Sequence, residues 1–234
     1  MPRHLLLIST STVHGTAYLE HAFEELRDFL GRTARVLFIP FALKDHQAYA
    51  ARARATFNSI GFGLDSLHEA PSPADALESA EAVFTGGGNT FRLLDALCRL
   101  DLVHILRRRA REGMLYSGAS AGSNLACPTI MTTNDMPIVE PPTLDALALV
   151  SFQINPHYLD PDPGSTHMGE TRETRIREFH EENATPVVGL REGAMLRVDG
   201  DSVLLKGIAG ARIFRRGQEP LEVLPVARLE PLLG

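Results

Sequence analysis

The sequence predicts an α/β fold: a doubly wound, mostly parallel sheet flanked by helices, with antiparallel strands near the C-terminal end. Over the first two-thirds of the chain, short apolar runs alternate with segments whose apolar residues recur at helical spacing. Such alternation is typical of a parallel sheet covered on both faces. Some apolar runs end in small residues, as at Gly86-Gly87-Gly88, which suits a turn from a strand into a helix. Asp199-Gly200 lies between alternating apolar residues and predicts a β-hairpin.

The predicted elements follow one another in the order that this fold requires. A buried strand over 4–9 precedes a helix over 15–30, in which Leu19, Phe23, Leu26 and Leu30 share one face. Further strands are predicted over 35–40, 64–67, 81–85 and 113–116, and further helices over 45–59, 75–79 and 90–109, the last broken near Leu100. Strands over 147–154 and 186–190 enclose a polar loop over 155–169 and a charged helix over 170–182. The antiparallel strands are predicted over 194–198, 202–205 and 212–214.

Length and charge bound the class of protein. A chain of 234 residues with 44% hydrophobic content suits one large α/β domain, which we take as residues 1–234. The net charge of -6 argues against a nucleic-acid partner, because phosphate binding needs a basic face. A basic cluster at the end of a predicted helix is interpreted as a solvated helix end; it consists of Arg107, Arg108, Arg109 and Arg111.

We expect no metal, no cofactor and no membrane partner. Cys98 and Cys127 do not have a metal-binding spacing, and the sequence contains no H-E-x-x-H motif. No apolar stretch approaches the length that spans a bilayer, and no signal peptide is recognised at the start. A cytoplasmic location is therefore predicted.

Gly118-Ala119-Ser120-Ala121-Gly122 follows an apolar run and precedes a short helical stretch. A G-x-S-x-G turn between a strand and a helix is typical of a nucleophile elbow, in which small neighbours permit a strained turn that exposes the serine hydroxyl. The N–H group of Ala121 would then face an oxyanion at the helix N-terminus. The alternative is a tight turn without chemistry.

Gly86-Gly87-Gly88-Asn89-Thr90 follows another predicted strand. It lacks the spacing and the lysine of a P-loop, and it does not match G-x-G-x-x-G. A turn that needs positive φ requires fewer glycines than these. We favour a loop whose backbone N–H groups approach a tetrahedral intermediate.

Reactive side chains follow several of the predicted strands. Active sites in open α/β sheets lie beyond the carboxyl ends of strands, and Ser120, His157 and Glu192 all follow predicted strands. A serine, a histidine and a carboxylate could form a triad in any chain order. His14 and His167 are weaker candidates, because His14 is better explained as a loop residue and His167 as a surface residue near the start of a helix.

The chain resembles the peptidase E family, the α-aspartyl dipeptidases. The segments that carry the resemblance occur in order over nearly the whole chain: Phe84-Thr85-Gly86-Gly87-Gly88-Asn89-Thr90-Phe91, Gly118-Ala119-Ser120-Ala121-Gly122-Ser123-Asn124-Leu125-Ala126, Thr132-Thr133-Asn134-Asp135-Met136-Pro137, Ile154-Asn155-Pro156-His157 and Gly169-Glu170-Thr171-Arg172.

The resemblance implies a serine dipeptidase with a class I glutamine amidotransferase-like fold, acting on small peptides with an N-terminal aspartate (Asp-X). It implies Ser120 as nucleophile, His157 as general base, and the N–H groups of Gly88 and Ala121 as the oxyanion hole. The third member stays open between Asp135 and Glu192, because the amidotransferase position two residues after the histidine is occupied by Leu159. Asp135 is also a candidate to bind the α-amino group of the substrate.

Selectivity for Asp-X requires groups that bind a carboxylate, and an arginine fork suits one. Candidate substrate-binding residues are Arg172, Arg175, Asn89 and Glu170, whereas Arg177 is expected to pair with Glu173 on the helix surface. Ala119 stands where a tryptophan is expected in close relatives, which predicts a wider pocket. A homodimer is a candidate assembly. The alternative functions are a cyanophycinase-like hydrolase of β-aspartyl linkages and a non-catalytic module that binds a small molecule.

Overall fold

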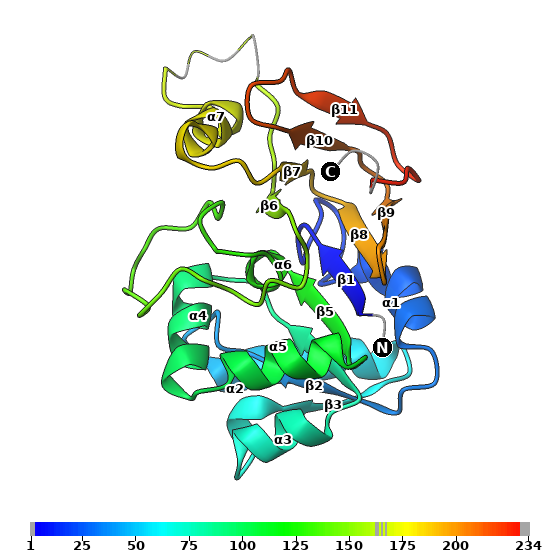
Figure 1. Ribbon diagram of the computed structural model, residues 1–234. Helices are drawn as coiled ribbons and strands as arrows, with labels where there is room; N and C mark the ends of the chain where they lie inside the picture. The colour runs from blue at the N-terminus through cyan, green and yellow to red at the C-terminus, as the bar shows by residue number, and fades with distance from the viewer. Residues whose placement is uncertain (1–2, 162–163, 165, 167, 230–234) are drawn as a thin grey trace.

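The computed structural model describes residues 3–161, 164, 166 and 168–229, and its largest element is a seven-stranded sheet (Figure 1). The strand order is β3-β2-β4-β5-β1-β8-β9. The strands are β1 (His4–Ile8), β2 (Arg35–Ile39), β3 (Gly63–Ser66), β4 (Ala82–Thr85), β5 (Leu115–Ala119), β8 (Ala194–Asp199) and β9 (Ser202–Gly207). The first five are parallel, while β8 pairs antiparallel with β1 and β9 antiparallel with β8. This confirms the predicted sheet and the Asp199-Gly200 hairpin.

Helices cover both faces of this sheet, as a doubly wound fold requires. One face packs against α1 (Phe23–Leu30) and α2 (His46–Ser59), and the other packs against α3 (Pro73–Ser79), α4 (Thr90–Arg99), α5 (Val103–Arg111) and α6 (Ala121–Leu125). Side chains alternate between the two faces along a strand. Leu5 and Leu7 of β1 therefore join one core, and Leu6 and Ile8 join the other. All four are fully buried, which explains the unbroken apolar run of this central strand.

A second, four-stranded sheet lies beyond one end of the first, together with α7 (Arg172–Glu182), at the top of Figure 1. Its order is β11-β10-β7-β6, with β6 (Gln153–Pro156), β7 (Val187–Leu190), β10 (Ala211–Phe214) and β11 (Leu221–Val223). Strands β6 and β7 are parallel, whereas β10 and β11 run antiparallel to their neighbours. The sequence predicted β6, β7 and β10 but not their separation from the main sheet, and it did not predict β11.

The predicted strand over 147–154 is wrong in its first part. Only Gln153–Pro156 forms a strand. The N–H groups of Leu147, Ala148 and Leu149 instead donate to the carbonyls of Leu125, Cys127 and Ala126, each at 2.9 Å. These carbonyls lie at the end of α6, where a helix leaves its last carbonyls without internal partners. The buried apolar run thus caps a helix, and Ala148 has φ 47°, outside the strand region.

The predicted helix over 15–30 is also shorter than expected. A 3-10 helix, η1 (Glu20–Ala22), precedes α1, which begins only at Phe23. Gly15 and Leu19 have positive φ, which breaks the helix before that point. The break predicted near Leu100 is confirmed, because α4 ends at Arg99 and α5 begins at Val103.

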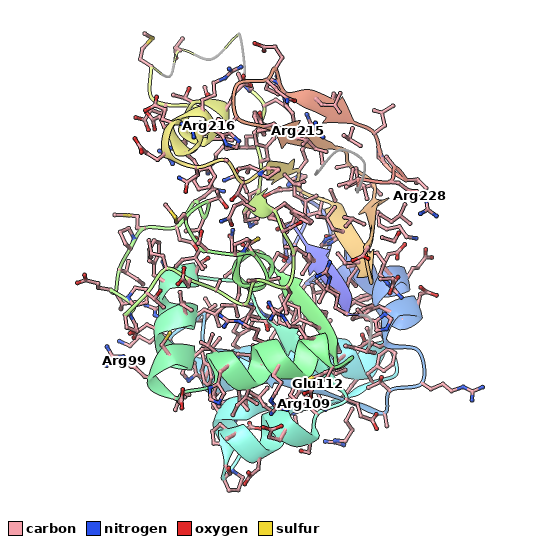
Figure 2. All side chains as sticks on the ribbon, in the orientation of Figure 1. Arg99, Arg109, Glu112, Arg215, Arg216 and Arg228 are labelled. Atoms are coloured by element: carbon pink, nitrogen blue, oxygen red, sulfur yellow. The ribbon has the colours of Figure 1, made fainter. Side chains whose placement is uncertain are left out.

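The arginine cluster on α5 bonds to neighbouring loops. Arg107 donates to the carbonyls of Ala146 and Leu147, and Arg109 donates to that of Ala80. Figure 2 shows Arg109 and Glu112 in the half of the molecule away from α7. No helix in the described part of the chain is both long and apolar enough to cross a membrane.

Candidate active site

The carboxyl ends of strands from both sheets meet at one place. Ser9 directly follows β1, Ser120 follows β5, His157 follows β6, and Glu192 lies two residues beyond β7. The N–H group of Ser120 donates to the carbonyl of Ile8 at 2.9 Å. The hydroxyl of Ser9 donates to the carbonyl of Leu190 at 2.7 Å. The second sheet therefore brings its strand ends to the carboxyl edge of the first, where ligands bind in this class of fold.

Ser120 occupies a sharp turn between β5 and α6. It has φ 52° and ψ −105°, a conformation that a residue with a side chain rarely adopts. Glycines allow the tight packing around it: a Cβ on Gly118 would lie 2.5 Å from the backbone of Gly122, and one on Gly122 would collide with the carbonyl of Thr85. The hydroxyl of Ser123 fastens the turn, because its one proton lies within hydrogen-bond reach of the carbonyls of Ile8 and Gly118, at 2.8 and 2.9 Å from Oγ. This geometry is that of a nucleophile elbow.

Ser120, His157 and Glu192 form a continuous hydrogen-bonded chain. Ser120 Oγ lies 2.8 Å from His157 Nε2, and His157 Nδ1 lies 3.0 Å from Glu192 Oε1. With the proton on Nδ1, the imidazole donates to the carboxylate and accepts from the serine hydroxyl. The side chains of His157 and Glu192 are 34% and 47% exposed, so the chain opens to solvent and to a substrate. Such an arrangement can activate a serine for attack on a carbonyl.

The backbone around His157, which has φ 53°, is held by four side chains: those of Ser9, Asn124, Thr132 and Asn134. The N–H group of His157 donates to Ser9 Oγ at 3.0 Å. Just before it, the carbonyl of Pro156 accepts from Asn134 Nδ2 at 2.6 Å, and that of Ile154 accepts from Asn124 Nδ2 at 2.7 Å. Asn124 lies on α6, so the helix after Ser120 also bonds to the strand that carries His157.

The glycine loop lies directly against Ser120. A Cβ on Gly87 would lie 3.2 Å from the Cβ of Ser120, and Gly88 has φ 135°, a value that only glycine adopts readily. Within the described part of the chain, the N–H group of Gly88 has no hydrogen-bond acceptor. The loop can therefore present a free backbone donor beside the serine.

The structure brings Glu192, and not Asp135, to His157. The carboxylate of Asp135 instead lies at the start of α4: its Oδ2 accepts from the N–H and hydroxyl groups of Thr90 at 2.8 and 2.6 Å, and from the hydroxyl of Thr133 at 2.9 Å. A negative charge at a helix N-terminus is stabilised by the helix dipole.

The four predicted substrate-binding residues differ in their availability. Asn89 uses its side chain structurally, because its Oδ1 caps α4 by accepting from the N–H of Arg92 and its Nδ2 donates to the carbonyl of Met136. Arg175 and Glu170 pair with each other at 3.3 Å, and both are about half exposed. Arg172 is half-buried. Burial, together with the charge of Arg175, lowers its pKa, and nearby Asp135 acts in the opposite direction.

Other predicted features have simple outcomes. Arg177 pairs with Glu173 at 2.8 Å, as predicted. Ala119 is fully buried in the core beside α1 and α2, which removes the basis for expecting a wider pocket from that residue. His14 is exposed, and His167 lies outside the described residues.

Sequence reasoning missed Ser9 and Asn124, which support the site without reacting. The signal for Ser9 was available, because it is a polar residue at the carboxyl end of an otherwise apolar strand. Asn124 carries no such signal, since a helical asparagine is more often exposed, whereas this one is fully buried.

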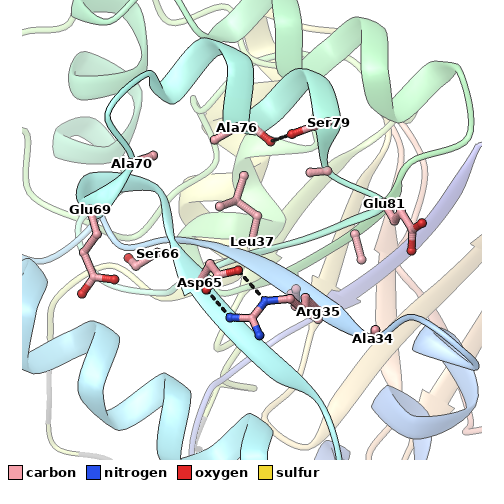
Figure 3. A pocket seen from close by; sticks show the side chains of 13 residues that line it. Ala34, Arg35, Leu37, Asp65, Ser66, Glu69, Ala70, Ala76, Ser79 and Glu81 are labelled. Atoms are coloured by element: carbon pink, nitrogen blue, oxygen red, sulfur yellow. Dashed lines mark hydrogen bonds and ion pairs between the residues drawn. The ribbon is translucent and has the colours of Figure 1, made fainter.

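A cavity of about 590 Å³ lies elsewhere, beside α3, the edge strand β3 and its neighbour β2 (Figure 3). Arg35 and Asp65 form an ion pair at its wall. The cavity reaches Arg35 and Glu81, at the amino ends of β2 and β4. It is therefore distinct from the edge of the sheet where Ser120 lies.

Comparisons with known proteins identify the family of this chain. The model of Peptidase family S51 matches residues 5–206. Peptidase E of Streptomyces coelicolor is 55% identical over 230 residues, which cover 98% of this chain and 95% of that protein. The probable alpha-aspartyl dipeptidase of Drosophila melanogaster is 46% identical over 234 residues, with 99% and 98% covered. Among solved structures, a peptidase from an acI-B1 actinobacterium superposes with a TM-score of 0.72 at 15% identity, covering 97% of this chain and 96% of that chain, and so supports the fold alone.

Proposed function

Because this chain belongs to peptidase family S51 and is a serine-type dipeptidase, we propose that it hydrolyses dipeptides with an N-terminal aspartate, Asp-X, through Ser120, His157 and Glu192. The observation that carries the proposal is the hydrogen-bonded chain from Ser120 Oγ through His157 to Glu192 Oε1. The relatives named peptidase E and alpha-aspartyl dipeptidase support Asp-X as the substrate class.

The proposed chemistry has two steps. Ser120 Oγ gives its proton to His157 Nε2 and attacks the peptide carbonyl, and the N–H groups of Gly88 and Ala121 bind the oxyanion that forms. The intermediate collapses to an aspartyl ester of Ser120, and His157 gives the proton to the departing amine of X. Water, activated by His157, then hydrolyses the ester and restores the serine. Glu192 keeps the imidazole oriented and stabilises its charged form.

Asp135 and Arg172 offer a complementary pair of charges for an N-terminal aspartate. Its α-ammonium and β-carboxylate groups carry opposite charges a few bonds apart. We assign the ammonium to Asp135, whose Oδ2 accepts the bonds from Thr90 and Thr133 while Oδ1 has none to the described residues. We assign the β-carboxylate to Arg172, because Arg175 is already paired with Glu170. A guanidinium fork suits a carboxylate.

We also propose that the enzyme acts in the cytoplasm. Cys98 and Cys127 are both free thiols, which suits a reducing compartment. The groups assigned above come from one chain, so the chemistry does not depend on the candidate homodimer.

The test is hydrolysis of Asp-Leu, Glu-Leu, Leu-Leu and β-linked Asp-Leu by the wild-type protein and Ser120→Ala. We expect a preference for α-linked Asp-Leu and a loss on the order of 10⁴-fold or more in kcat for Ser120→Ala. Preference for the β-linked substrate would favour the cyanophycinase-like alternative. A wild-type protein that cleaves none of these peptides would leave the non-catalytic binding module as the better account.

The assignment of Arg172 has a matched control on the same helix. Arg172→Met should lower kcat/KM for Asp-Leu by about 10- to 100-fold, the effect expected for a lost charged hydrogen bond, and should reduce the preference over Leu-Leu. Arg175→Met removes an equal charge from an exposed ion pair and should leave the preference nearly unchanged. Equal effects of the two substitutions would contradict the assignment.

A further inference from the structure

The hydroxyl of Tyr49, on α2, bonds to the glycine loop beside Ser120. Tyr49 Oη donates to the carbonyl of Gly87 at 3.0 Å. The side chain is only 3% exposed, so solvent does not offer this carbonyl an equivalent partner from that side. The contact connects a helix on the opposite face from α4 to the loop that precedes α4.

The bond acts on one particular peptide group. The carbonyl of Gly87 and the N–H of Gly88 belong to the same planar unit and point in opposite directions. Whatever fixes the direction of the carbonyl therefore also fixes the direction of the N–H group. The N–H of Gly88 is the proposed oxyanion donor, and it has no acceptor among the described residues.

We propose that Tyr49 is a positioning residue of the oxyanion hole, which holds the Gly87–Gly88 peptide so that the N–H of Gly88 points at the reacting carbonyl. The inference rests on the proposed function of Ser120. Tyr49 does not touch the substrate; it acts through the peptide that does.

The loop needs such an anchor because consecutive glycines leave its peptide groups free to rotate. The loop is fixed on both sides by the N–H of Gly86, which donates to Ile39 at 3.2 Å, and by that of Asn89, which donates to Ala42 at 2.9 Å. Tyr49 supplies the bond to the peptide between them. Gly86 permits this approach, since a Cβ there would collide with the Tyr49 hydroxyl.

Tyr49 is itself held firmly. Its ring meets Phe38 edge-on with centroids 4.9 Å apart, and the guanidinium of Arg52 lies 5.0 Å from its centroid. Burial raises the pKa of Tyr49, so its hydroxyl stays protonated and able to donate at neutral pH. The hydroxyl of Tyr18 donates to Tyr49 Oη at 3.3 Å, and a chain of this kind polarises the bond to Gly87.

Tyr18 provides the matched control. It is a buried tyrosine in the same cluster, and its hydroxyl is one bond further from the loop. Tyr49→Phe and Tyr18→Phe each remove one buried hydroxyl and keep the ring, so their effects on stability should be similar. Only Tyr49→Phe removes the direct bond to Gly87.

The experiment measures kcat and KM for Asp-Leu, affinity for an aspartyl aldehyde, and the rate at which a fluorophosphonate modifies Ser120. Removing one oxyanion donor lowers kcat by about 10²- to 10³-fold, and we expect a smaller fall where the donor remains but is poorly oriented. For Tyr49→Phe we expect kcat and the modification rate to fall by about 5- to 50-fold and aldehyde affinity to fall in step. KM and the pH profile of kcat should stay unchanged, because the contacts of His157 are intact. Tyr18→Phe should stay within about twofold of wild type in kcat.

The inference is overturned if Tyr49→Phe matches wild type, if Tyr18→Phe loses as much, or if only KM changes. Gly86→Ala displaces the same hydroxyl and should reproduce the kcat effect, which keeps the inference testable if Tyr49→Phe does not fold. The modification rate does not depend on the peptide substrate. If the wild-type protein reacts with the fluorophosphonate but leaves Asp-Leu intact, the substrate assignment is contradicted. The role of Tyr49 is then still tested by the rate at which the fluorophosphonate modifies Ser120. If Ser120 of the wild-type protein reacts with neither the fluorophosphonate nor Asp-Leu, both the proposed function and the role of Tyr49 are overturned.

Discussion

At the scale of single residues, two residues of the site adopt strained backbone conformations. Ser120 and His157 have φ of 52° and 53°, values that cost about 1–3 kcal/mol each for residues with a side chain. Such conformations persist only where the surroundings hold them. Here Ser123 bonds to the carbonyl of Gly118 before Ser120, Ser9 accepts from the N–H of His157, and Asn134 donates to the carbonyl just before His157.

Glu192→Gln should remove most of the activity while leaving the fold intact. The amide presents a donor or an uncharged acceptor to Nδ1, so it neither enforces the reactive tautomer nor stabilises the imidazolium. We expect kcat for Asp-Leu to fall by about 10²- to 10⁴-fold, with the lower end favoured by the partial exposure of the carboxylate.

Asp135→Asn is the comparison for that substitution. If Asp135 binds the α-ammonium group, its loss should raise KM more than it lowers kcat. A larger fall in kcat for Asp135→Asn than for Glu192→Gln would contradict the assignment of Glu192 as the partner of His157.

The sequence left Asp135 and Glu192 as equal candidates for a physical reason. Which carboxylate reaches His157 depends on the pairing of β6 with β7, in which Pro156 lies opposite Leu190. That register brings the residues that follow each strand together. Pairing between strands separated by a helix is a tertiary property, and the local pattern around either carboxylate does not contain it.

At the scale of elements, Ser9 joins three strands. Ser9 directly follows β1. Its hydroxyl accepts from the N–H of His157, which follows β6, and donates to the carbonyl of Leu190 at the end of β7. We expect Ser9→Ala to lower kcat by about 10-fold, because His157 and Glu192 lose a shared anchor, and to lower the unfolding free energy by about 1–3 kcal/mol, the cost of unpaired buried groups.

Ser117→Ala is the matched control for Ser9→Ala. Ser117 is equally buried, and its hydroxyl makes a 2.9 Å bond to the carbonyl of Val83 within the same sheet. The Ser117→Ala variant should lose about as much unfolding free energy as Ser9→Ala but keep its activity. If both variants lose activity in proportion to stability, Ser9 has no special role in positioning the triad.

Local pattern predicted the elements of the main sheet well and the approach to His157 poorly. Strands β1, β2 and β4 are buried on both faces, so they appear in the sequence as apolar runs. The run from Leu147 to Val150 is equally apolar, but the N–H groups of its first three residues bond to the end of α6. Periodicity reports burial, and it does not reveal which backbone groups a buried segment will bond to.

At the scale of the whole molecule, stability should depend on pH through two partly buried histidines, His21 and His46. Burial lowers the pKa of His21 and of His46 below the usual 6.5. Both ring nitrogens of His21 are shielded from solvent, so the fold accommodates the neutral ring better than the charged one. Backbone hydrogen bonding acts in the opposite direction on both pKa values, from Thr10 at His21 and from Leu43 at His46, and the charges of Glu192 and Asp45 add to it.

The direction of the effect follows from proton linkage. Below pH 6.5 the unfolded chain binds protons at these histidines before the folded protein does, so the unfolding free energy decreases as the pH falls. The stabilisation that the neutral histidines contribute is complete above about pH 6.5. It is lost as the pH falls from there through the lowered pKa values of the folded protein. The carboxylates of Asp65 and Asp160, whose pKa values are lowered by hydrogen bonds from Arg35 and Arg191, lose their stabilising effect only below about pH 4. The range from pH 5 to 8 therefore isolates the histidines.

Urea denaturation of the wild-type protein, His21→Gln and His46→Gln at pH 5, 6, 7 and 8 would measure this dependence. Each substitution should flatten the decline in unfolding free energy below pH 6.5, because one fewer group takes up a proton on unfolding. His14→Gln, at an exposed position, should leave the slope unchanged. A wild-type protein whose stability is constant or increases between pH 7 and pH 5, or a slope that His14→Gln flattens as much as His21→Gln, would show that burial of these two rings does not control acid stability.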